Sequence, residues 1–253
     1  MVINQSKLIQ WYREDAGMKI AITRLEGKEG SDNARCAKFG FECYRVSPLR
    51  AEIQTQVIGE FVRRVNEEHY DCIFFTSALP ARLVAPLLTR WPRIIAIGPQ
   101  TAGTLEEYKI PCETLPSHYS RAFVPYLGSW IRGKKIGIPR ADVPNPGLIE
   151  AIRDAGGIPE EMRCYALIPT EEPLDLRGAD AVLFTSAMSF TRGVWEMRPG
   201  LLVMAIGEVT ADAIRMGGID PGITGDGTLE GTLSALQGYL QKKGHVKTPF
   251  QKR

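Results

Sequence analysis

The chain has 253 residues, of which 44% are hydrophobic and 24% charged, and its formal net charge is +2. This composition is that of an ordinary globular protein. The 31 basic residues are nearly balanced by 29 acidic ones, so the charge does not indicate a nucleic-acid partner. No apolar run approaches the roughly 18 residues of a membrane span and the N-terminus lacks a signal pattern, so we expect a cytoplasmic protein with no membrane partner.

Short apolar segments alternate with amphipathic ones along the chain. We predict a strand over 19–23, a helix near 31–39, a strand over 41–46 and a helix from about Ala51 to Glu68, where apolar residues recur at helical spacing. Further strands are predicted over 72–75, 93–97, 135–139, 181–184 and 201–206. Continuous apolar strands separated by helices indicate an α/β fold whose parallel sheet is covered on both faces.

An internal repeat is the most informative feature of the sequence. Phe75-Thr76-Ser77-Ala78 recurs as Phe184-Thr185-Ser186-Ala187, and Ala96-Ile97-Gly98 recurs as Ala205-Ile206-Gly207. Thr101-Ala102 and Thr210-Ala211 keep the same spacing, so that the residue numbers of every pair differ by 109. The chain therefore holds two similar α/β units.

Each repeated segment is predicted to be a strand end that leads into a helix. Ligands of open α/β sheets bind at the carboxyl ends of the strands, where helix amides and the helix dipole attract anions. Two domains that bring such edges together would form a cleft for a ligand. The competing interpretation is that these serines and threonines only cap helices. Glu208 stands where the first copy has Pro99, and its charge would repel a carboxylate there.

Several other kinds of site are not supported by the sequence. No G-x-G-x-x-G motif follows a strand, and the three histidines are too scattered for a metal site. The five cysteines are odd in number and lack C-x-x-C spacing, which favours free thiols. If the protein is an enzyme, we expect it to act by holding and shaping its substrate.

The order and spacing of the doubled motifs resemble the uroporphyrinogen-III synthase family over about Met18 to Leu240. Supporting positions are Arg24 after the first strand, Pro48 after the second, Tyr119-Ser120 before a helix, Arg140 after a strand, and Cys164-Tyr165. Leu79-Pro80 and Glu208 depart from the family pattern at two helix starts.

The resemblance implies an α/β fold of two similar flavodoxin-like parallel-sheet domains joined by two connecting strands. One domain would comprise 18–46 and 170–243, and the other 47–169, leaving an N-terminal extension over 1–17 and a basic tail over 244–253. It also implies a monomeric, cyclising lyase of porphyrin biosynthesis that needs no cofactor and no metal. Its substrate would be hydroxymethylbilane, a linear tetrapyrrole, and its product uroporphyrinogen III, with ring D inverted and water lost.

The resemblance also implies the site residues. Tyr165 would assist the loss of the substrate hydroxyl; the competing interpretation is that it packs at a hinge. The substrate-binding residues would be Arg24, Thr76, Ser77, Ala78, Gly98, Thr101, Ser120, Arg140, Thr185, Ser186, Ala187, Gly207 and Thr210. Solvated arginine is the competing interpretation for Arg24 and Arg140.

Two other functions stay open at this point. One is a non-catalytic tetrapyrrole- or anion-binding module on the same fold, which is weakened by the lack of a fused effector segment. The other is a different two-domain α/β transferase, against which the missing phosphate loops argue.

Overall fold

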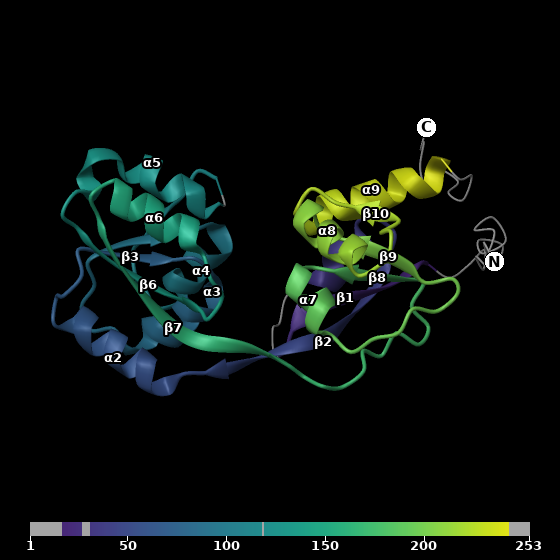
Figure 1. Ribbon diagram of the computed structural model, residues 1–253, viewed down its shortest axis with the longest axis horizontal. Coiled ribbons are helices and arrows are strands. Elements are labelled where there is room, and N and C mark those ends of the chain that lie inside the picture. The colour runs from purple at the N-terminus through teal and green to yellow at the C-terminus, as the bar shows by residue number, and fades with distance from the viewer. Residues whose placement is uncertain (1–16, 27–30, 118, 243–253) are drawn as a thin grey trace. The chain divides into compact units, whose positions relative to one another are not determined.

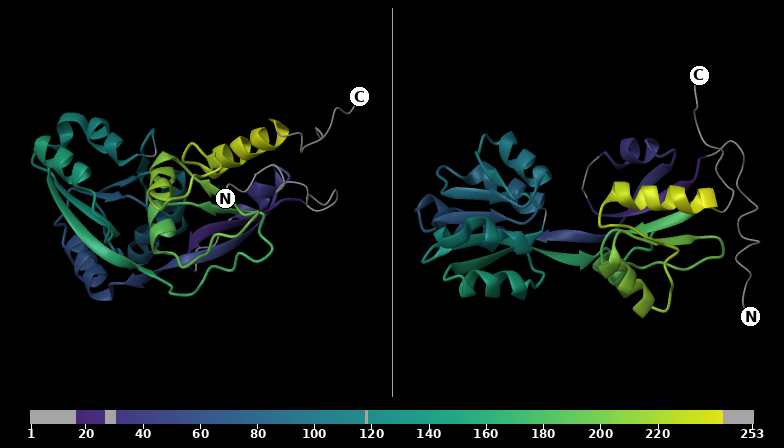
Figure 2. Two further views of the ribbon diagram at one scale, coloured as in Figure 1. Left: turned by 45° about the vertical axis from the view of Figure 1, so that its right-hand side comes forward. Right: turned by 90° about the horizontal axis from the view of Figure 1, so that it is seen from above.

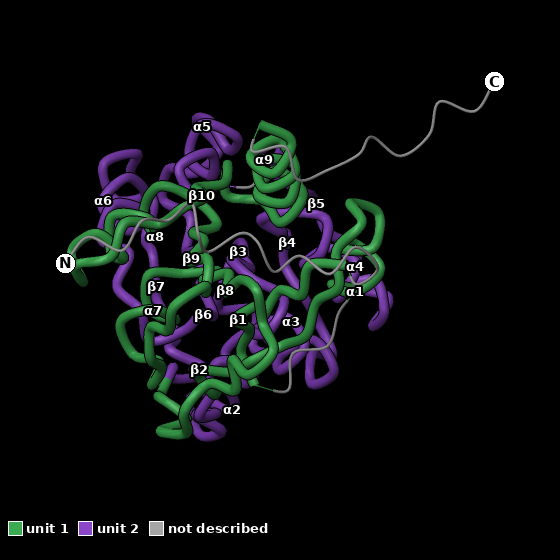
Figure 3. The backbone as a smooth tube through the Cα atoms, turned by 90° about the vertical axis from the view of Figure 1, so that its right-hand side faces the viewer, with its two compact units in different colours: residues 1–50, 168–253 green, residues 51–167 purple. Residues whose placement is uncertain are grey.

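The computed structural model describes residues 17–26, 31–117 and 119–242. These residues fall into two compact units, coloured separately in Figure 3: unit 1 is drawn from residues 1–50 and 168–253, and unit 2 is residues 51–167. The expected N-terminal extension (1–17) and basic tail (244–253) lie outside the described residues, apart from Gly17.

Unit 1 is built on a parallel sheet in the order β2-β1-β8-β9-β10. Its elements are β1 (Lys19–Leu25), α1 (Asp32–Ala37), β2 (Glu42–Ile53), β8 (Ala181–Phe184), α7 (Ala187–Arg192), β9 (Leu202–Ala205), α8 (Glu208–Met216), β10 (Ile223–Thr224) and α9 (Leu229–Lys242).

Successive residues of these strands pack on opposite faces of the sheet. Ile20 and Leu183 belong to one apolar cluster with Leu233 of α9, whereas Val182 belongs to another with Ile214 of α8. Helices therefore cover both faces of the sheet. The right-hand view of Figure 2 shows α9 and α1 on one side, and α7 and α8, in green to yellow-green, on the other.

Unit 2 has a parallel sheet in the order β7-β6-β3-β4-β5 (Figure 1). Its strands are β3 (Cys72–Phe75), β4 (Arg93–Ala96), β5 (Glu113–Thr114), β6 (Lys135–Ala141) and β7 (Ile158–Pro169). Its α-helices are α2 (Thr55–Asn66), α3 (Ala78–Val84), α4 (Pro99–Glu107), α5 (Phe123–Leu127) and α6 (Pro146–Asp154), with 3-10 turns η2 (Ala85–Leu87), η3 (Ser120–Ala122) and η4 (Gly128–Ile131).

The same alternation builds the core of unit 2. Phe75 packs with Phe61 of α2, while Phe74 packs on the other face, where its ring stacks on that of Phe123 at a centroid distance of 4.1 Å. The predicted α/β class with a parallel sheet covered on both faces is thus confirmed.

Two predicted boundaries near the first repeat are wrong. The second strand was expected to end at 46, yet β2 continues to Ile53 and contains Pro48. The helix expected from Ala51 begins only at Thr55, because the Gln54 amide donates to the Cys164 carbonyl at 2.9 Å and the chain stays extended up to that bond. The apolar spacing still identified the buried face of α2, which carries Ile58, Phe61 and Val65.

All five cysteines are free thiols, and they differ in their surroundings. Burial raises the pKa of Cys72 to about 12 and that of Cys164 to about 11. Cys43 is only half-buried, and a hydrogen bond from the Cys36 thiol holds its pKa below the usual value while raising that of Cys36.

We therefore expect Cys43 to be the first thiol alkylated by iodoacetamide near neutral pH, since the thiolate is the nucleophile. Peptide mass spectrometry during the reaction measures the order. Cys43→Ser should abolish the fast phase, and a fast phase that persists in this variant would contradict the prediction.

No helix among the described residues is long and apolar enough to cross a membrane.

Candidate functional site

The two copies of the repeat end their strands in the same way. Phe75 of β3 pairs with Ala96 of β4, and Phe184 of β8 pairs with Ala205 of β9, which is the same register in both units. In each copy the residue after the second strand donates its amide to the phenylalanine carbonyl at 3.0 Å, as Ile97 does to Phe75 and Ile206 to Phe184. The repeated sequence thus encodes a repeated strand edge.

The helices that follow the glycines also begin alike. Gly98 and Gly207 are the N-caps of α4 and α8, and both have extended backbones. The amides of Thr101 and Thr210 donate to the carbonyls of these glycines at 3.1 Å, and both threonines are buried. These backbone bonds close the first turn of each helix, and the helix dipole makes its start electropositive.

Gly207 lies against a second backbone segment. A Cβ atom at this position would meet the amide nitrogen and Cα of Gly227 at 3.3 Å. The close approach of the two backbone segments is the reason that glycine is needed at this position. Left-handed strain is not the reason, because the backbone of Gly207 is extended. In the same turn Glu208 pairs with Arg215 at 2.9 Å, so part of the acidic charge expected to repel an anion is neutralised.

The first half of each motif differs between the copies. In unit 1, Thr185 donates its hydroxyl to the Thr23 carbonyl at 2.7 Å, and its amide donates to the Thr23 hydroxyl at 2.9 Å. Ser186 caps α7 by accepting from the Ser189 amide at 3.0 Å. In unit 2, Ser77 occupies the N-cap position of α3 without making a side-chain cap.

The Thr23–Thr185 contact predicts a difference in stability between equivalent substitutions. Thr185→Val removes a hydroxyl that donates to the carbonyl of the buried Thr23 and should lower the free energy of unfolding by about 1 kcal/mol. Thr76→Val is the matched control, since no side-chain bond of Thr76 is found in the described part of the chain. Urea denaturation measures both, and equal losses would show that the contact adds nothing.

Ser77 instead meets Tyr165. This tyrosine lies on β7 opposite Ala141, at the end of β6, and is 7% exposed. Burial raises the pKa of its phenol, which a hydrogen bond with Ser77 partly offsets. The phenol is therefore protonated at neutral pH and carries a proton that it can donate in a hydrogen bond.

Arg140 lies beside this tyrosine in the sheet. It comes from the end of β6, its side chain is 10% exposed, and it donates to Glu161 at 2.6 Å and to the Val143 carbonyl. Its Nε is buried without a partner. The interpretation of Arg140 as a solvated surface arginine is therefore wrong.

Arg24 is also largely buried. It lies at the end of β1 with a side chain that is 15% exposed, and it makes a bidentate ion pair with Asp32 at 2.9 Å. The solvated interpretation is wrong here too.

The structure groups the expected site residues by unit. Because all the strands of each sheet are parallel, their carboxyl ends lie at one edge. Unit 1 gathers there Arg24, Thr185, Ser186, Ala187, Gly207 and Thr210, and unit 2 gathers Thr76, Ser77, Ala78, Gly98, Thr101, Arg140 and Tyr165. Ser120 starts η3, where its hydroxyl accepts from Asn145 Nδ2 at 3.4 Å.

The sequence profile of the family described as uroporphyrinogen-III synthase HemD matches residues 31–234, which is most of the chain. This chain belongs to the uroporphyrinogen-III synthase family. The repeated strand ends, the repeated helix starts and Tyr165 all lie within the matched range.

Two solved uroporphyrinogen III synthases share the fold. The enzyme from the extremely thermophilic bacterium Thermus thermophilus, a mutant form, is 21% identical, with a TM-score of 0.56 over 91% of this chain and 100% of that one. The enzyme from Helicobacter pylori is 13% identical, with a TM-score of 0.60 over 88% of this chain and 99% of that one. No curated protein matches the chain.

Membership of the uroporphyrinogen-III synthase family makes the chain an enzyme, a cyclising lyase of tetrapyrrole and haem biosynthesis. Formation of uroporphyrinogen III is its function, and a non-catalytic binding module on the same fold is not favoured.

Sequence reasoning about this synthase missed Asp32. It is 4% exposed and accepts from two arginines, Arg24 and Arg45. A signal was present, since an acidic residue at the predicted start of a helix follows a strand that ends in arginine. The partners themselves could not be read from the sequence, because they depend on how β1, β2 and α1 pack.

Proposed function

We propose that the chain closes hydroxymethylbilane to uroporphyrinogen III, with inversion of ring D and loss of water. The observation that carries this proposal is that the same strand edge occurs in both units. The strands of the two copies pair in the same register, and the same two backbone hydrogen bonds form at the turns that follow them. Family membership supplies the reaction, and the repeated edges supply matching sites for a substrate that carries many carboxylates.

The first contact we propose is between the substrate carboxylates and these edges. The starts of α4 and α8 would attract carboxylates through first-turn amides and the helix dipole. The residues proposed to bind substrate are Arg24, Thr76, Ser77, Ala78, Gly98, Thr101, Ser120, Arg140, Thr185, Ser186, Ala187, Gly207 and Thr210. The buried Thr101 and Thr210 would act by fixing the turns.

The chemistry proposed needs little from protein side chains. An electron-rich pyrrole expels the hydroxyl to give an azafulvene, and the substituted carbon of ring D attacks it to form a spiro intermediate that reopens and recloses. No cofactor is required, because the pyrroles themselves stabilise the cation. The protein must select the attacking carbon, and such positioning is worth about 7–11 kcal/mol in favourable cases.

Tyr165 is the side chain we propose for the loss of the hydroxyl. The protonated phenol would donate a hydrogen bond to the departing oxygen, directly or through water. Its burial supports this role, since packing at 7% exposure fixes the orientation of the phenol. The contribution should be modest, because a phenol of raised pKa is a weak acid.

We also propose the finer description of the fold. Each unit would be a flavodoxin-like domain, supported by strand orders that correspond to 2-1-3-4-5 once unit 2 is read from β6. One domain would comprise 18–46 and 170–243 and the other 47–169. β2 and β7 would be the connecting strands, since the unit boundaries at 50/51 and 167/168 fall within them. We propose a monomer that acts in the cytoplasm, where free thiols such as these are usual.

Analysis of the product isomers tests the proposed function. Purified protein is mixed with freshly made hydroxymethylbilane, and the uroporphyrinogens are oxidised and separated by chromatography. We expect isomer III to form faster than the spontaneous cyclisation, which gives isomer I. Isomer I alone, formed at the spontaneous rate, would refute the proposal, and tight binding without isomer III would favour the binding module instead.

A further inference from the structure

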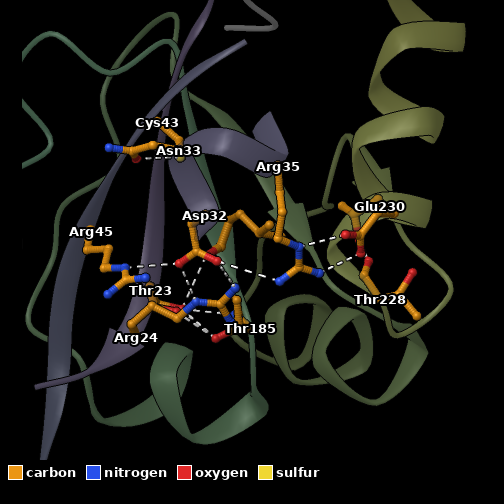
Figure 4. A network of polar contacts seen from close by, with 12 residues as sticks. Thr23, Arg24, Asp32, Asn33, Arg35, Cys43, Arg45, Thr185, Thr228 and Glu230 are labelled. Carbon is orange, nitrogen blue, oxygen red and sulfur yellow. Dashed lines mark hydrogen bonds and ion pairs between the residues drawn. The ribbon is translucent and has the colours of Figure 1, made fainter. Parts of the chain in front are cut away.

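A cluster of charged side chains lies at the carboxyl edge of the unit 1 sheet (Figure 4). Its centre is Asp32, in the first turn of α1. Arg24 donates to both of its oxygens, through Nε and Nη2 at 2.9 Å each, and Arg45 donates through Nε at 3.0 Å. Arg35 approaches the same carboxylate at 3.7 Å and pairs with Glu230 of α9. One carboxylate is thus shared by several guanidinium groups.

The side chains of this cluster differ in how far they are exposed to solvent. The Asp32 side chain is 5% exposed, whereas those of Arg24, Arg45 and Arg35 are 15%, 26% and 33% exposed. An anion from solvent therefore meets guanidinium groups before it meets the carboxylate. The arginines also hold the pKa of Asp32 below its usual value against the effect of burial, so the carboxylate is ionised at neutral pH.

The position of Arg24 is fixed relative to the repeated motif. It follows Thr23 in β1, whose hydroxyl and carbonyl both accept hydrogen bonds from Thr185. Ser186, the cap of α7, comes next in the chain. The bidentate pair with Asp32 uses Nε and Nη2 of Arg24, so Nη1 takes no part in it. A guanidinium held along one edge in this way presents its remaining donors to a second carboxylate.

We infer that Arg24 forms a subsite for a substrate carboxylate in unit 1, and that Asp32 is the positioning residue that orients it. Without Asp32 the long arginine side chain would sample several rotamers, and each binding event would bear the cost of ordering it. The inference rests on the proposed function for the identity of the ligand, a polycarboxylated tetrapyrrole. Asp32 itself contacts no substrate and acts only through Arg24.

A double-mutant cycle tests this coupling. We expect Asp32→Asn and Arg24→Gln each to raise the KM for hydroxymethylbilane about fivefold to tenfold, with kcat changed less than about twofold. The double variant should have the KM of Arg24→Gln alone, because the guanidinium that Asp32 is inferred to orient for the substrate is then absent. Glu230→Gln is the matched control, since it removes a carboxylate at the rim of the same cluster and should leave KM unchanged.

Several outcomes would overturn the inference. An unchanged KM in Asp32→Asn would do so, as would effects that add fully in the double variant, because Asp32 would then act elsewhere. If Asp32→Asn does not fold, Asp32→Glu replaces it: the charge is kept but the carboxylate moves by one methylene, so KM should still rise while the melting temperature holds. An unchanged KM in the Asp32→Glu variant would also contradict the inference.

A binding measurement separates this inference from the proposed function. Uroporphyrin III, a stable tetrapyrrole with the same carboxylates, is titrated calorimetrically into the wild type and into each variant. Weaker binding by both Arg24→Gln and Asp32→Asn supports the subsite even if the wild type makes no isomer III, in which case only the proposed function fails. An active wild type whose variants bind uroporphyrin equally well refutes the subsite alone.

Discussion

Replacement of Tyr165 by phenylalanine should slow the formation of uroporphyrinogen III about tenfold while leaving the fold intact. The change removes only the hydroxyl, which we propose as the donor to the departing oxygen. Positioned acids are worth about 10²–10⁴-fold in general, and a phenol of raised pKa should lie at or below the lower end. Single-turnover formation of isomer III measures the rate, and thermal unfolding checks the fold.

The chain offers a matched control for this substitution. Tyr44 follows Cys43 on β2 as Tyr165 follows Cys164 on β7, but its hydroxyl donates to the Asp175 carbonyl at 2.9 Å. Tyr44→Phe should therefore leave turnover unchanged. Because the pKa of Tyr165 is raised, its phenol stays protonated across the usual assay range, and the ratio of wild-type to Tyr165→Phe rates should not vary between about pH 6 and 9. A Tyr165→Phe enzyme of normal rate would make this residue structural.

Truncation of the repeated phenylalanines should produce the largest losses of stability. Phe75 and Phe184 are fully buried at equivalent positions of the two copies, and they belong to separate apolar clusters. Replacing either by alanine should cost about 3–5 kcal/mol, since it deletes a core side chain and leaves a cavity. Phe75→Ala should reduce protection from hydrogen exchange within 51–167, and Phe184→Ala within the described part of unit 1.

Hydrogen exchange followed by mass spectrometry resolves the two responses by peptide. Val209→Ala is the control, because Val209 is 78% exposed and its loss should change protection in neither unit. Equal loss of protection in both units from either phenylalanine substitution would mean that the units do not unfold separately, and would contradict the proposed domain division.

Two arginines that form ion pairs, Arg24 and Arg140, show what could be predicted from the sequence and what could not. Arg24 and Arg140 were recognised as residues at strand ends, since each follows an apolar strand in the sequence. Their burial and their partners were not predicted, because Asp32 and Glu161 come from other elements. A charged side chain can be buried only where the packing of several elements supplies its counter-charge.

Local sequence determined the elements of this protein. The apolar strands, the buried face of α2 and the doubled strand-end motifs follow from periodicity and turn residues, which act over a few positions of the chain. The exact 109-residue repeat even predicted that both copies would share one geometry, and their strand registers do.

Tertiary structure alone decided which side chains meet. Ser77 and Tyr165 come together because β3, β6 and β7 are neighbours in that order, and Asp32 gathers its arginines because β1 and β2 pair beside α1. The continuation of β2 to Ile53 likewise depends on a hydrogen bond with β7. These contacts join residues far apart in the chain, and strand order and register, which no local pattern encodes, determine them.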